Sequence, residues 1–274
     1  MKNIKCNIVL KKNLANVIES IVEKSLDKAK DAGNKKKILV SLILVFGFAL
    51  SGYSDYTGNL AFAQCDSAFD IQYNVGSTIN FGSYEQDNNV CNGNENIEWI
   101  ILAKDEEKEL LISKYALDVK PYNNEYNRTT WEDCTLRKWL NEDFLNNAFN
   151  EEEQKRIITS TISADNNLKY NTLPGEVTRD KIFILSSTEA AEYLTDENTR
   201  VCVPTEYAVK QGAYTSNSCF FEDMATCWWW LRSPGKNVKN ASCVNCEGTI
   251  SNNGTYVHCR LNCVRPTLWL DIKG

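Results

Sequence analysis

Residues 228–235 read WWWLRSPG, and residues 263–270 read CVRPTLWL. These two blocks constrain the structure more strongly than any other part of the chain. Each tryptophan ring needs about 150–250 Å² of burial. Successive side chains of a strand point to opposite faces, so Trp228 and Trp230 are expected on one face and Trp229 on the other. Both faces of this predicted strand must therefore be covered, which requires a packed domain.

The residues before these blocks alternate short strands with short helices. Strands are predicted at residues 78–82, 97–103, 109–115, 181–185, 228–232 and 264–271. The second and third of these form a hairpin, because a short charged turn separates them. Residues 219–226 are expected to be irregular. This pattern predicts one α+β domain spanning residues 64–274.

A helical stretch is predicted in the middle of that domain. Thr130 stands three residues before Asp133, which is typical of a helix N-cap. Apolar residues then recur every three to four positions, as on the core face of a helix: Leu136, Trp139, Leu140, Phe144, Ala148 and Phe149. Ser186 or Ser187, with Glu189 in the first turn, predicts a second short helix through Tyr193.

One further hairpin is expected near the C-terminal end. Asn252-Asn253-Gly254 predicts its turn between residues 244–250 and 255–259, because Asn-Gly readily adopts positive φ. In that register Cys243 would face position 264.

The N-terminal residues carry a different signal. Lys35-Lys36-Lys37 precede an uncharged apolar run, ILVSLILVFGFAL, at residues 38–50. The run is shorter than the roughly 20 residues of a membrane-spanning helix, and its charged flank is typical of a signal peptide. Residues 61–63 read AFA, a cleavage pattern. Residues 38–63 are therefore expected to be either a signal peptide or a membrane anchor, which would meet the membrane through residues 38–50.

Charge divides the chain in the same place. Residues 1–37, a basic N-terminal tail, hold ten lysines and four acidic residues, and residues 38–63 add only Asp55. The whole chain has a net charge of −6, so residues 64–274 carry −11. An acidic domain repels phosphate backbones, so nucleic acid is not an expected partner.

Ordered motifs along the domain resemble one uncharacterised bacterial family, the domain of unknown function 6273. They read INFGSY at 79–84, EWIIL at 98–102, LISKY at 111–115, TWE at 130–132, LRKWLN at 136–141, FILS at 183–186 and PTEYA at 204–208, followed by the two terminal blocks. The resemblance covers residues 78–270 and implies no known activity. Glu85 and Cys263 depart from the family pattern, where proline and glycine are common.

The terminal blocks are also similar to those of C-type-lectin-like folds and sulfatase-modifying relatives. That likeness implies a strand near the C-terminus beneath a loop-rich binding surface. It covers short motifs, and a fold by itself does not define a function.

Cysteine is abundant in the predicted domain, which holds ten of the eleven in the chain. Cys243, Cys246, Cys259 and Cys263 follow the spacing C-x2-C-x12-C-x3-C, which resembles a zinc ribbon. Three interpretations stay open for these four residues: disulfides, as suits an exported domain, free thiols, or a zinc site. No other cofactor is expected.

A catalytic interpretation depends on two of those cysteines. Cys259 and Cys263 are the candidates for a thiol- or metal-dependent enzyme of the formylglycine-generating type. The sole histidine, His258, excludes histidine-rich zinc sites, and no G-x-S-x-G motif supports a serine triad.

A binding interpretation uses the aromatic and basic residues of the terminal blocks. Trp229, Arg232, Arg265 and Tyr214 are the candidate ligand-binding residues, with Tyr170 on a neighbouring loop. The two arginines either recognise an anion or order the loops by pairing with Asp271 or Glu132.

Together these features predict an exported protein at the cell surface, membrane-anchored or secreted. Its expected function is non-catalytic binding of a cell-envelope or extracellular ligand, which is a glycan, a peptide or a wall component. The alternatives are the thiol- or metal-dependent enzyme and a structural envelope protein.

Overall fold

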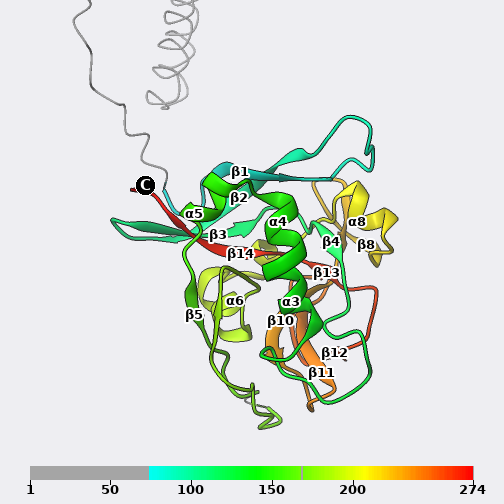
Figure 1. Cartoon of the computed structure of the whole chain (residues 1–274). Helices are drawn as coiled ribbons and strands as arrows, with labels where there is room; N and C mark the ends of the chain where they lie inside the picture. Colours follow the sequence, from blue (N-terminus) through cyan, green and yellow to red (C-terminus); the bar gives the residue numbers. More distant parts are fainter. Residues whose placement is uncertain (1–73, 168, 274) are drawn as a thin grey trace, which may run out of the picture. The chain divides into compact units, whose positions relative to one another are not determined.

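The computed structural model of the protein describes residues 74–167 and 169–273 (Figure 1). The described residues belong to one compact unit, residues 70–274. The predicted basic tail and the signal or anchor segment at residues 38–63 lie outside the described residues.

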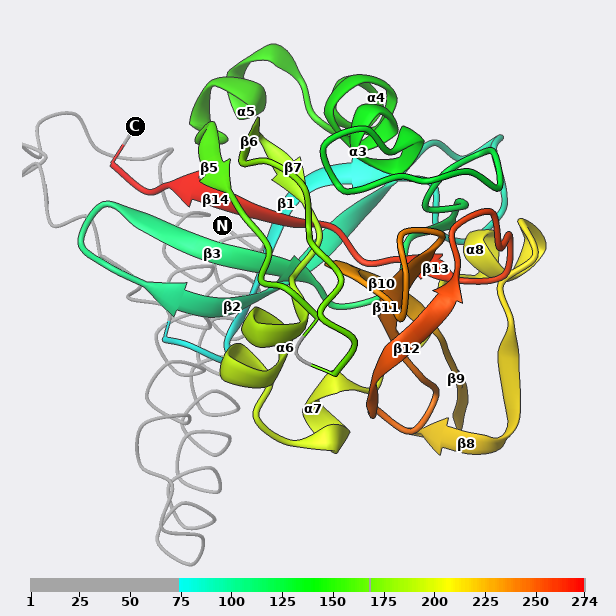
Figure 2. The ribbon, with the colours of Figure 1, turned by 90° about the horizontal axis from the view of Figure 1, so that it is seen from below.

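The first sheet has five antiparallel strands and joins distant parts of the chain (Figures 1 and 2). In spatial order its strands are β1 (Thr78–Tyr84), β2 (Glu95–Lys104), β3 (Lys108–Ser113), β14 (Thr267–Asp271) and β7 (Ile182–Phe183). The predicted β2–β3 hairpin is confirmed, with Ile100 facing Ile112. β14 is the last strand in the sequence, yet it lies inside this sheet, between β3 and β7.

The second sheet contains the tryptophan block. In spatial order its strands are β12 (Ile250–Tyr256), β11 (Asn240–Val244), β10 (Trp229–Pro234), β13 (Cys263–Val264) and β4 (Asp118–Val119). β10 pairs with β13 in parallel and with β11 in antiparallel fashion. Two small sheets accompany it, β5 (Ser160–Ile162) with β6 (Thr178–Asp180), and β8 (Thr215–Phe221) with β9 (Met224–Cys227).

Burial on both faces of β10 is confirmed. Trp229 and Trp230 are both fully buried. The indole N–H of Trp229 donates to the Arg200 carbonyl at 3.0 Å, and that of Trp230 donates to the Lys120 carbonyl at 2.9 Å. Each ring therefore lies in a core with its one polar atom satisfied, as burial of an indole requires.

The predicted helical stretch forms three consecutive segments, with four short helices after it. The bounds are α3 (Thr135–Trp139), the π-helical η1 (Leu140–Phe144), α4 (Leu145–Ala148), α5 (Glu151–Arg156), α6 (Ser187–Tyr193), α7 (Glu197–Arg200) and α8 (Glu206–Lys210). The apolar stripe is confirmed as core, since all its members are buried except the partly buried Trp139. Short antiparallel strands with few helices confirm the α+β class.

The N-cap of that stretch is not Thr130, as the sequence predicted. Cys134 caps α3 instead, and its sulfur accepts from the Arg137 N–H at 3.4 Å. The reason lies in Trp131, whose indole N–H donates to the buried carboxylate of Asp180 at 3.0 Å. This anchor holds the residues before Cys134 in a turn. The prediction for α6 is confirmed, with Ser186 as the cap and Glu189 completing a capping box.

Residues 219–226 are not irregular, contrary to the prediction. They form much of the β8–β9 hairpin, whose two-residue turn consists of Glu222 and Asp223 at φ 50° and 66°. Positive φ at both turn positions matches the right-handed twist of paired strands. Acidic residues replace the usual Asn-Gly here, and for that reason the sequence signal was weak.

The last hairpin turns at a different place from the predicted one. Asn245 organises the turn between β11 and β12, because its side-chain oxygen accepts from the Glu247 and Thr249 N–H groups. Cys243 therefore faces Ser251 and not position 264. Gly254 lies within β12 at φ 68°, beside a register shift. A Cβ at this position would lie 2.2 Å from the Ala241 carbonyl oxygen, so the glycine serves a close backbone approach.

We expect Gly254→Ala to destabilise the fold more than a matched substitution at Gly93. Both glycines have positive φ, but a Cβ at Gly93 would meet nothing within 4 Å. Gly93→Ala should cost about 1–2 kcal/mol for the backbone conformation alone. Gly254→Ala should cost about 1–3 kcal/mol more, because it adds a steric clash. Urea unfolding of both variants measures the difference, and equal losses would contradict the proposed role of the close contact.

Candidate functional site

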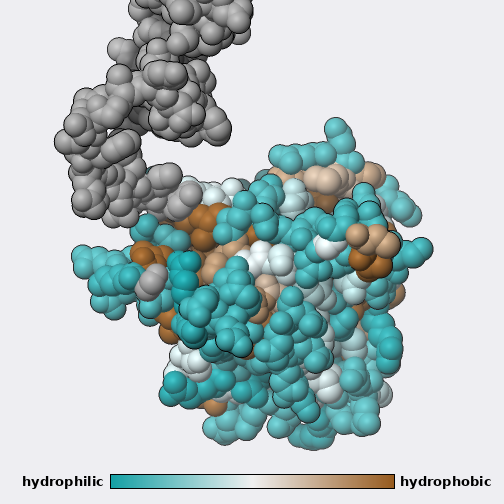
Figure 3. Space-filling model, turned by 45° about the horizontal axis from the view of Figure 1, so that its top comes forward, coloured by the Kyte–Doolittle hydropathy of each residue, from teal (hydrophilic) through white to brown (hydrophobic). Residues whose placement is uncertain are grey.

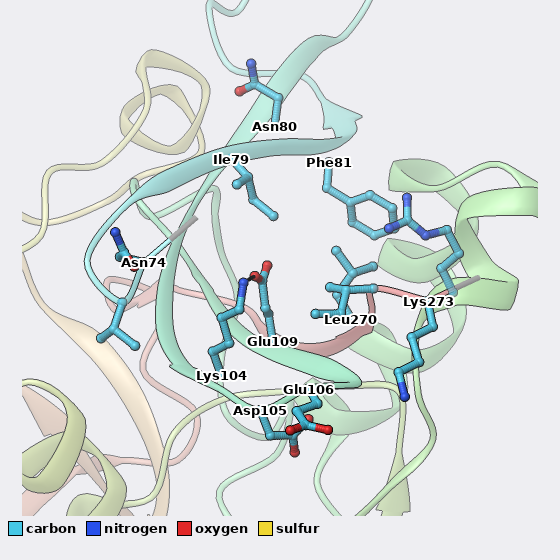
Figure 4. Close-up of a pocket in the computed structure, with 13 residues that line it drawn as sticks. Asn74, Ile79, Asn80, Phe81, Lys104, Asp105, Glu106, Glu109, Leu270 and Lys273 are labelled. Carbon is cyan, nitrogen blue, oxygen red and sulfur yellow. Dashed lines mark hydrogen bonds and ion pairs between the residues drawn. The ribbon is translucent and has the colours of Figure 1, made fainter. Parts of the chain in front are cut away.

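A cavity of about 1260 Å³ opens against the first sheet (Figure 4). Ile79 and Phe81 from β1 point across it toward Glu109 and Leu270. Its charged groups already interact with protein atoms. The buried Glu109 carboxylate pairs with the Lys104 ammonium at 3.0 Å, and Arg156 donates to the Asp271 carbonyl at 3.1 Å. Lys104 and Glu109 therefore compensate each other, whereas the buried Nε of Arg156 has no hydrogen-bond partner among the described residues.

A second cavity, of about 560 Å³, has a different chemical character. Its volume falls in the range of about 300–1,000 Å³ that is typical of small-molecule sites. Apolar and aromatic side chains form most of its wall, together with one buried cation, Arg265. The main contributors are Ile100 and Leu102 from β2, Tyr115, Tyr193 at the end of α6, Val203, and Phe221 and Met224 from the β8–β9 hairpin.

Arg265 is the unusual member of this wall. The residue is 2% exposed. Its Nε donates to the Ser113 carbonyl at 2.9 Å, and its guanidinium lies 5.1 Å from the centroid of the Trp229 ring. Among the described residues it has no carboxylate partner, and its Nη1 has no hydrogen-bond partner. The cavity wall thus contains a buried positive charge that no described acid neutralises.

Arg232, the other predicted arginine, is bound differently. Its guanidinium pairs with the Glu189 carboxylate at 2.5 Å and donates to the carbonyls of Ser163 and Ile184. The partner predicted for a structural role was Asp271 or Glu132, and the structure gives Glu189 instead. These contacts tie β10 to α6 and to the loop after β5.

The remaining predicted ligand-binding residues lie apart from the Arg265 cavity lining. Trp229 is fully buried and reaches the site only through its contact with Arg265. Tyr214 is 48% exposed, and its N–H donates to the Leu261 carbonyl. Tyr170 is exposed and bonds to Asn253.

The four cysteines of the zinc-like spacing do not share one site. Cys243 contacts Thr255, Cys246 lies in the β11–β12 turn, Cys259 contacts Asn262, and the buried Cys263 pairs with Trp229 across β10 and β13. All nine described cysteines are free thiols. The four cysteines stay apart because the hairpin turns earlier than the sequence predicted. Cys243 and Cys246 are therefore not in the predicted facing register.

Burial makes four of the nine described thiols poor nucleophiles. It raises the pKa of Cys134 to about 12 and that of Cys243 to about 11. It also raises the pKa values of Cys202 and Cys227 well above the ordinary range. A thiol must ionise to attack or to bind a metal, so these four are suited to packing.

Among the described residues, one group of acidic side chains has the spacing of a metal site. Glu85, Asp87 and Glu95 place carboxylate oxygens within 4.8 Å of one another after β1. The same three carboxylates accept N–H groups of Gln86 and Asn89, which organise the loop. These carboxylates have the chemistry to bind a cation, but their hydrogen bonds to the loop backbone already give them a structural role.

Sequence reasoning missed most of the cavity wall. Tyr115, Tyr193 and Met224 come from three segments whose proximity depends on tertiary packing. The one local signal was the FFEDM stretch at 220–224, in which apolar residues flank a charged pair as they do at an exposed hairpin tip.

The chain belongs to the family described as domain of unknown function 6273, whose model matches residues 106–272. This confirms the resemblance drawn from the ordered motifs. No curated protein and no solved structure matches the chain. None of the helices in the described part of the chain is long and apolar enough to cross a membrane.

We expect Arg232→Met to lower the free energy of unfolding by about 3–5 kcal/mol, because it leaves the Glu189 carboxylate without its buried partner. Lys138→Met is the matched control, since Lys138 and Glu142 form an exposed pair at 4.0 Å and should contribute at most about 0.5 kcal/mol. Urea titration measures both, and a small effect at Arg232 would contradict its structural role.

Stability should also depend on the ionisation of Cys243. The folded-state pKa of about 11 exceeds the ordinary value of 9.0, so the unfolded chain ionises first as pH rises. The contribution of the protonated Cys243 thiol to the free energy of unfolding is therefore present below pH 9 and is lost between pH 9 and pH 11. Cys243→Ser should therefore lose less stability over this interval, by about 1–3 kcal/mol. Parallel pH profiles of the two proteins would rule the effect out.

Proposed function

We propose that this domain is a non-catalytic ligand-binding module and that the cavity beside Arg265 is its binding site. The unpaired guanidinium in the cavity wall is the observation that carries the proposal. Export through the N-terminal segment is part of the same proposal, and it makes the ligand a cell-envelope or extracellular molecule.

The argument begins with the energy of a buried charge. Removing an ion from water costs several kcal/mol unless a partner of opposite charge or a set of hydrogen bonds compensates. Arg232 has such compensation, whereas Arg265 has one carbonyl and one aromatic ring. An anionic ligand in the cavity would supply the missing counter-charge to the guanidinium, so binding would gain Coulomb energy and a charge-assisted hydrogen bond at the part of the group that faces the cavity.

The rest of the wall defines the body of the ligand. Aliphatic side chains together with Tyr115 and Tyr193 favour an apolar or aromatic group. Asn198 and Thr199 add polar atoms to the lining, and Lys114 and Glu222 add one charge of each sign. The favoured ligand is therefore a carboxylate attached to an apolar body, such as a peptide end or a wall fragment. A neutral glycan would leave the guanidinium without an anion.

Other parts of the sequence interpretation stay predictions. They are the lectin-like topology, the envelope location, the thiol- or metal-dependent enzyme at Cys259 and Cys263, and the purely structural envelope protein. We favour the binding module over these alternatives because the cavity beside Arg265, within the described residues, indicates which kind of ligand it would bind.

Binding of anilinonaphthalene sulfonate, a fluorescent apolar anion, to the full chain would test this function. Arylalkyl carboxylates should displace the probe, whereas the matching primary amides should not. Arg265→Gln should lower the affinity for the carboxylates by about 10–100-fold. This factor corresponds to the loss of one charge-assisted hydrogen bond, which contributes about 1.5–3 kcal/mol.

Arg260→Gln is the control, since Arg260 is exposed and is not among the residues that line the cavity. It should leave the affinity unchanged. Equal displacement by carboxylates and amides, or equal affinities in the two variants, would reject Arg265 as the anion-binding group.

A further inference from the structure

We propose that Cys219 and Cys246 form a redox-active thiol pair, which exchanges with small disulfides and closes into an intramolecular disulfide. Cys219 belongs to β8, and Cys246 belongs to the turn between β11 and β12. The pair lies outside the Arg265 cavity lining.

The fold holds the two cysteines together from different elements. The buried hydroxyl of Thr226 contacts both backbones, at 3.1 Å from the Cys219 carbonyl oxygen and 2.7 Å from the Cys246 carbonyl oxygen. The two thiols are also close enough to influence each other, because each alters the pKa of the other. Figure 2 shows the β8–β9 hairpin beside β11 and β12, the arrangement that this contact requires.

Access to solvent separates this pair from most other described thiols. Cys219 and Cys246 are both partly exposed, whereas Cys134, Cys202, Cys227, Cys243 and Cys263 are buried. Cys91 is exposed and Cys259 is partly exposed. Among their described contacts, neither Cys91 nor Cys259 has a second thiol that is as accessible to solvent as the Cys219 and Cys246 thiols. A dissolved disulfide can therefore reach the pair.

The two thiols differ in a way that assigns their roles. Hydrogen bonds from Ser216 first, then from Cys246 and Ser218, lower the pKa of Cys219. Burial first, and then the neighbouring Cys219, raises the pKa of Cys246. Since the thiolate is the attacking species, Cys219 is the attacking thiol and Cys246 is the resolving thiol.

The exchange balances with one small disulfide as the oxidant. The Cys219 thiolate attacks a sulfur of the disulfide, which breaks the S–S bond, releases one thiolate and forms a mixed disulfide. Cys246 then loses its proton and attacks the Cys219 sulfur, which expels the second thiolate. Both released thiolates take up protons, so two protein thiols are oxidised and one disulfide is reduced to two thiols.

Closure would also affect the proposed binding site, and this consequence rests on the proposed function. The tip of the β8–β9 hairpin supplies Phe221, Glu222 and Met224 to the Arg265 cavity. A bond from Cys219 to Cys246 would fasten that hairpin to the second sheet and restrict the movement of this wall.

The experiment treats the reduced full chain with glutathione disulfide at neutral pH and follows intact mass and peptide maps. We expect a loss of two hydrogens, release of two glutathione molecules and one crosslinked peptide that joins Cys219 to Cys246. Dithiothreitol should reverse the change. A crosslink between other cysteines, or glutathione adducts without a crosslink, would overturn the proposal.

Single variants test the assigned roles. Cys246→Ser should accumulate a stable glutathione adduct at Cys219, formed several-fold faster than the adduct at exposed Cys91 in the same protein. Cys219→Ser should react at Cys246 several-fold more slowly, whereas Cys91→Ser should close the pair like the parent. Circular dichroism checks that each variant is folded. If Cys219 and Cys91 react at equal rates, the pair has no special reactivity. Mass detection does not depend on the cavity, so failure here and failure of carboxylate binding are separate results.

Discussion

The whole structure depends on covering both faces of one short strand, β10. Trp229 and Trp230 project to opposite sides, and each indole N–H must find an acceptor within a core. Because a single sheet face cannot meet this requirement, segments from most of the domain converge on β10. The strand meets β11 and β13 along its edges and α6 through Arg232. On the face of the molecule seen in Figure 3, the surface is mostly hydrophilic, with hydrophobic residues in separate patches.

Two buried arginines next to this core illustrate how different environments give the same residue different roles. Arg232 satisfies its donors with a carboxylate and two carbonyls, so its charge is compensated within the protein. Arg265 has only Ser113 and the face of Trp229 in comparable positions, and it lines a cavity. A buried charge without a partner in the folded chain is a reason to expect a ligand. A buried charge that the protein itself compensates is a reason to expect a structural role.

The sequence predicted those features that depend on neighbouring residues. The apolar stripe ending at Phe149 and the Ser186 capping box are local patterns, and both are found in the structure. The Asn-Gly signal at Gly254 failed because a glycine needed for close backbone approach looks the same as one needed for a turn. The meeting of Cys219 with Cys246 was not predictable from spacing, since it depends on two hairpins packing together. The sequence named Arg265 as a candidate ligand-binding residue, and its lack of an acidic partner became visible only in the structure.

The position of β14 has a consequence for how the chain acquires its structure. β14 separates β3 from β7, so residues 108–113 and 182–183 both pair with residues 267–271. During synthesis β3 and β7 each keep an unpaired edge until β14, which follows both in the sequence, has been made. Contacts of such long sequence separation slow folding. The β1–β2–β3 part of the sheet can form early from consecutive strands, but the complete sheet requires β14.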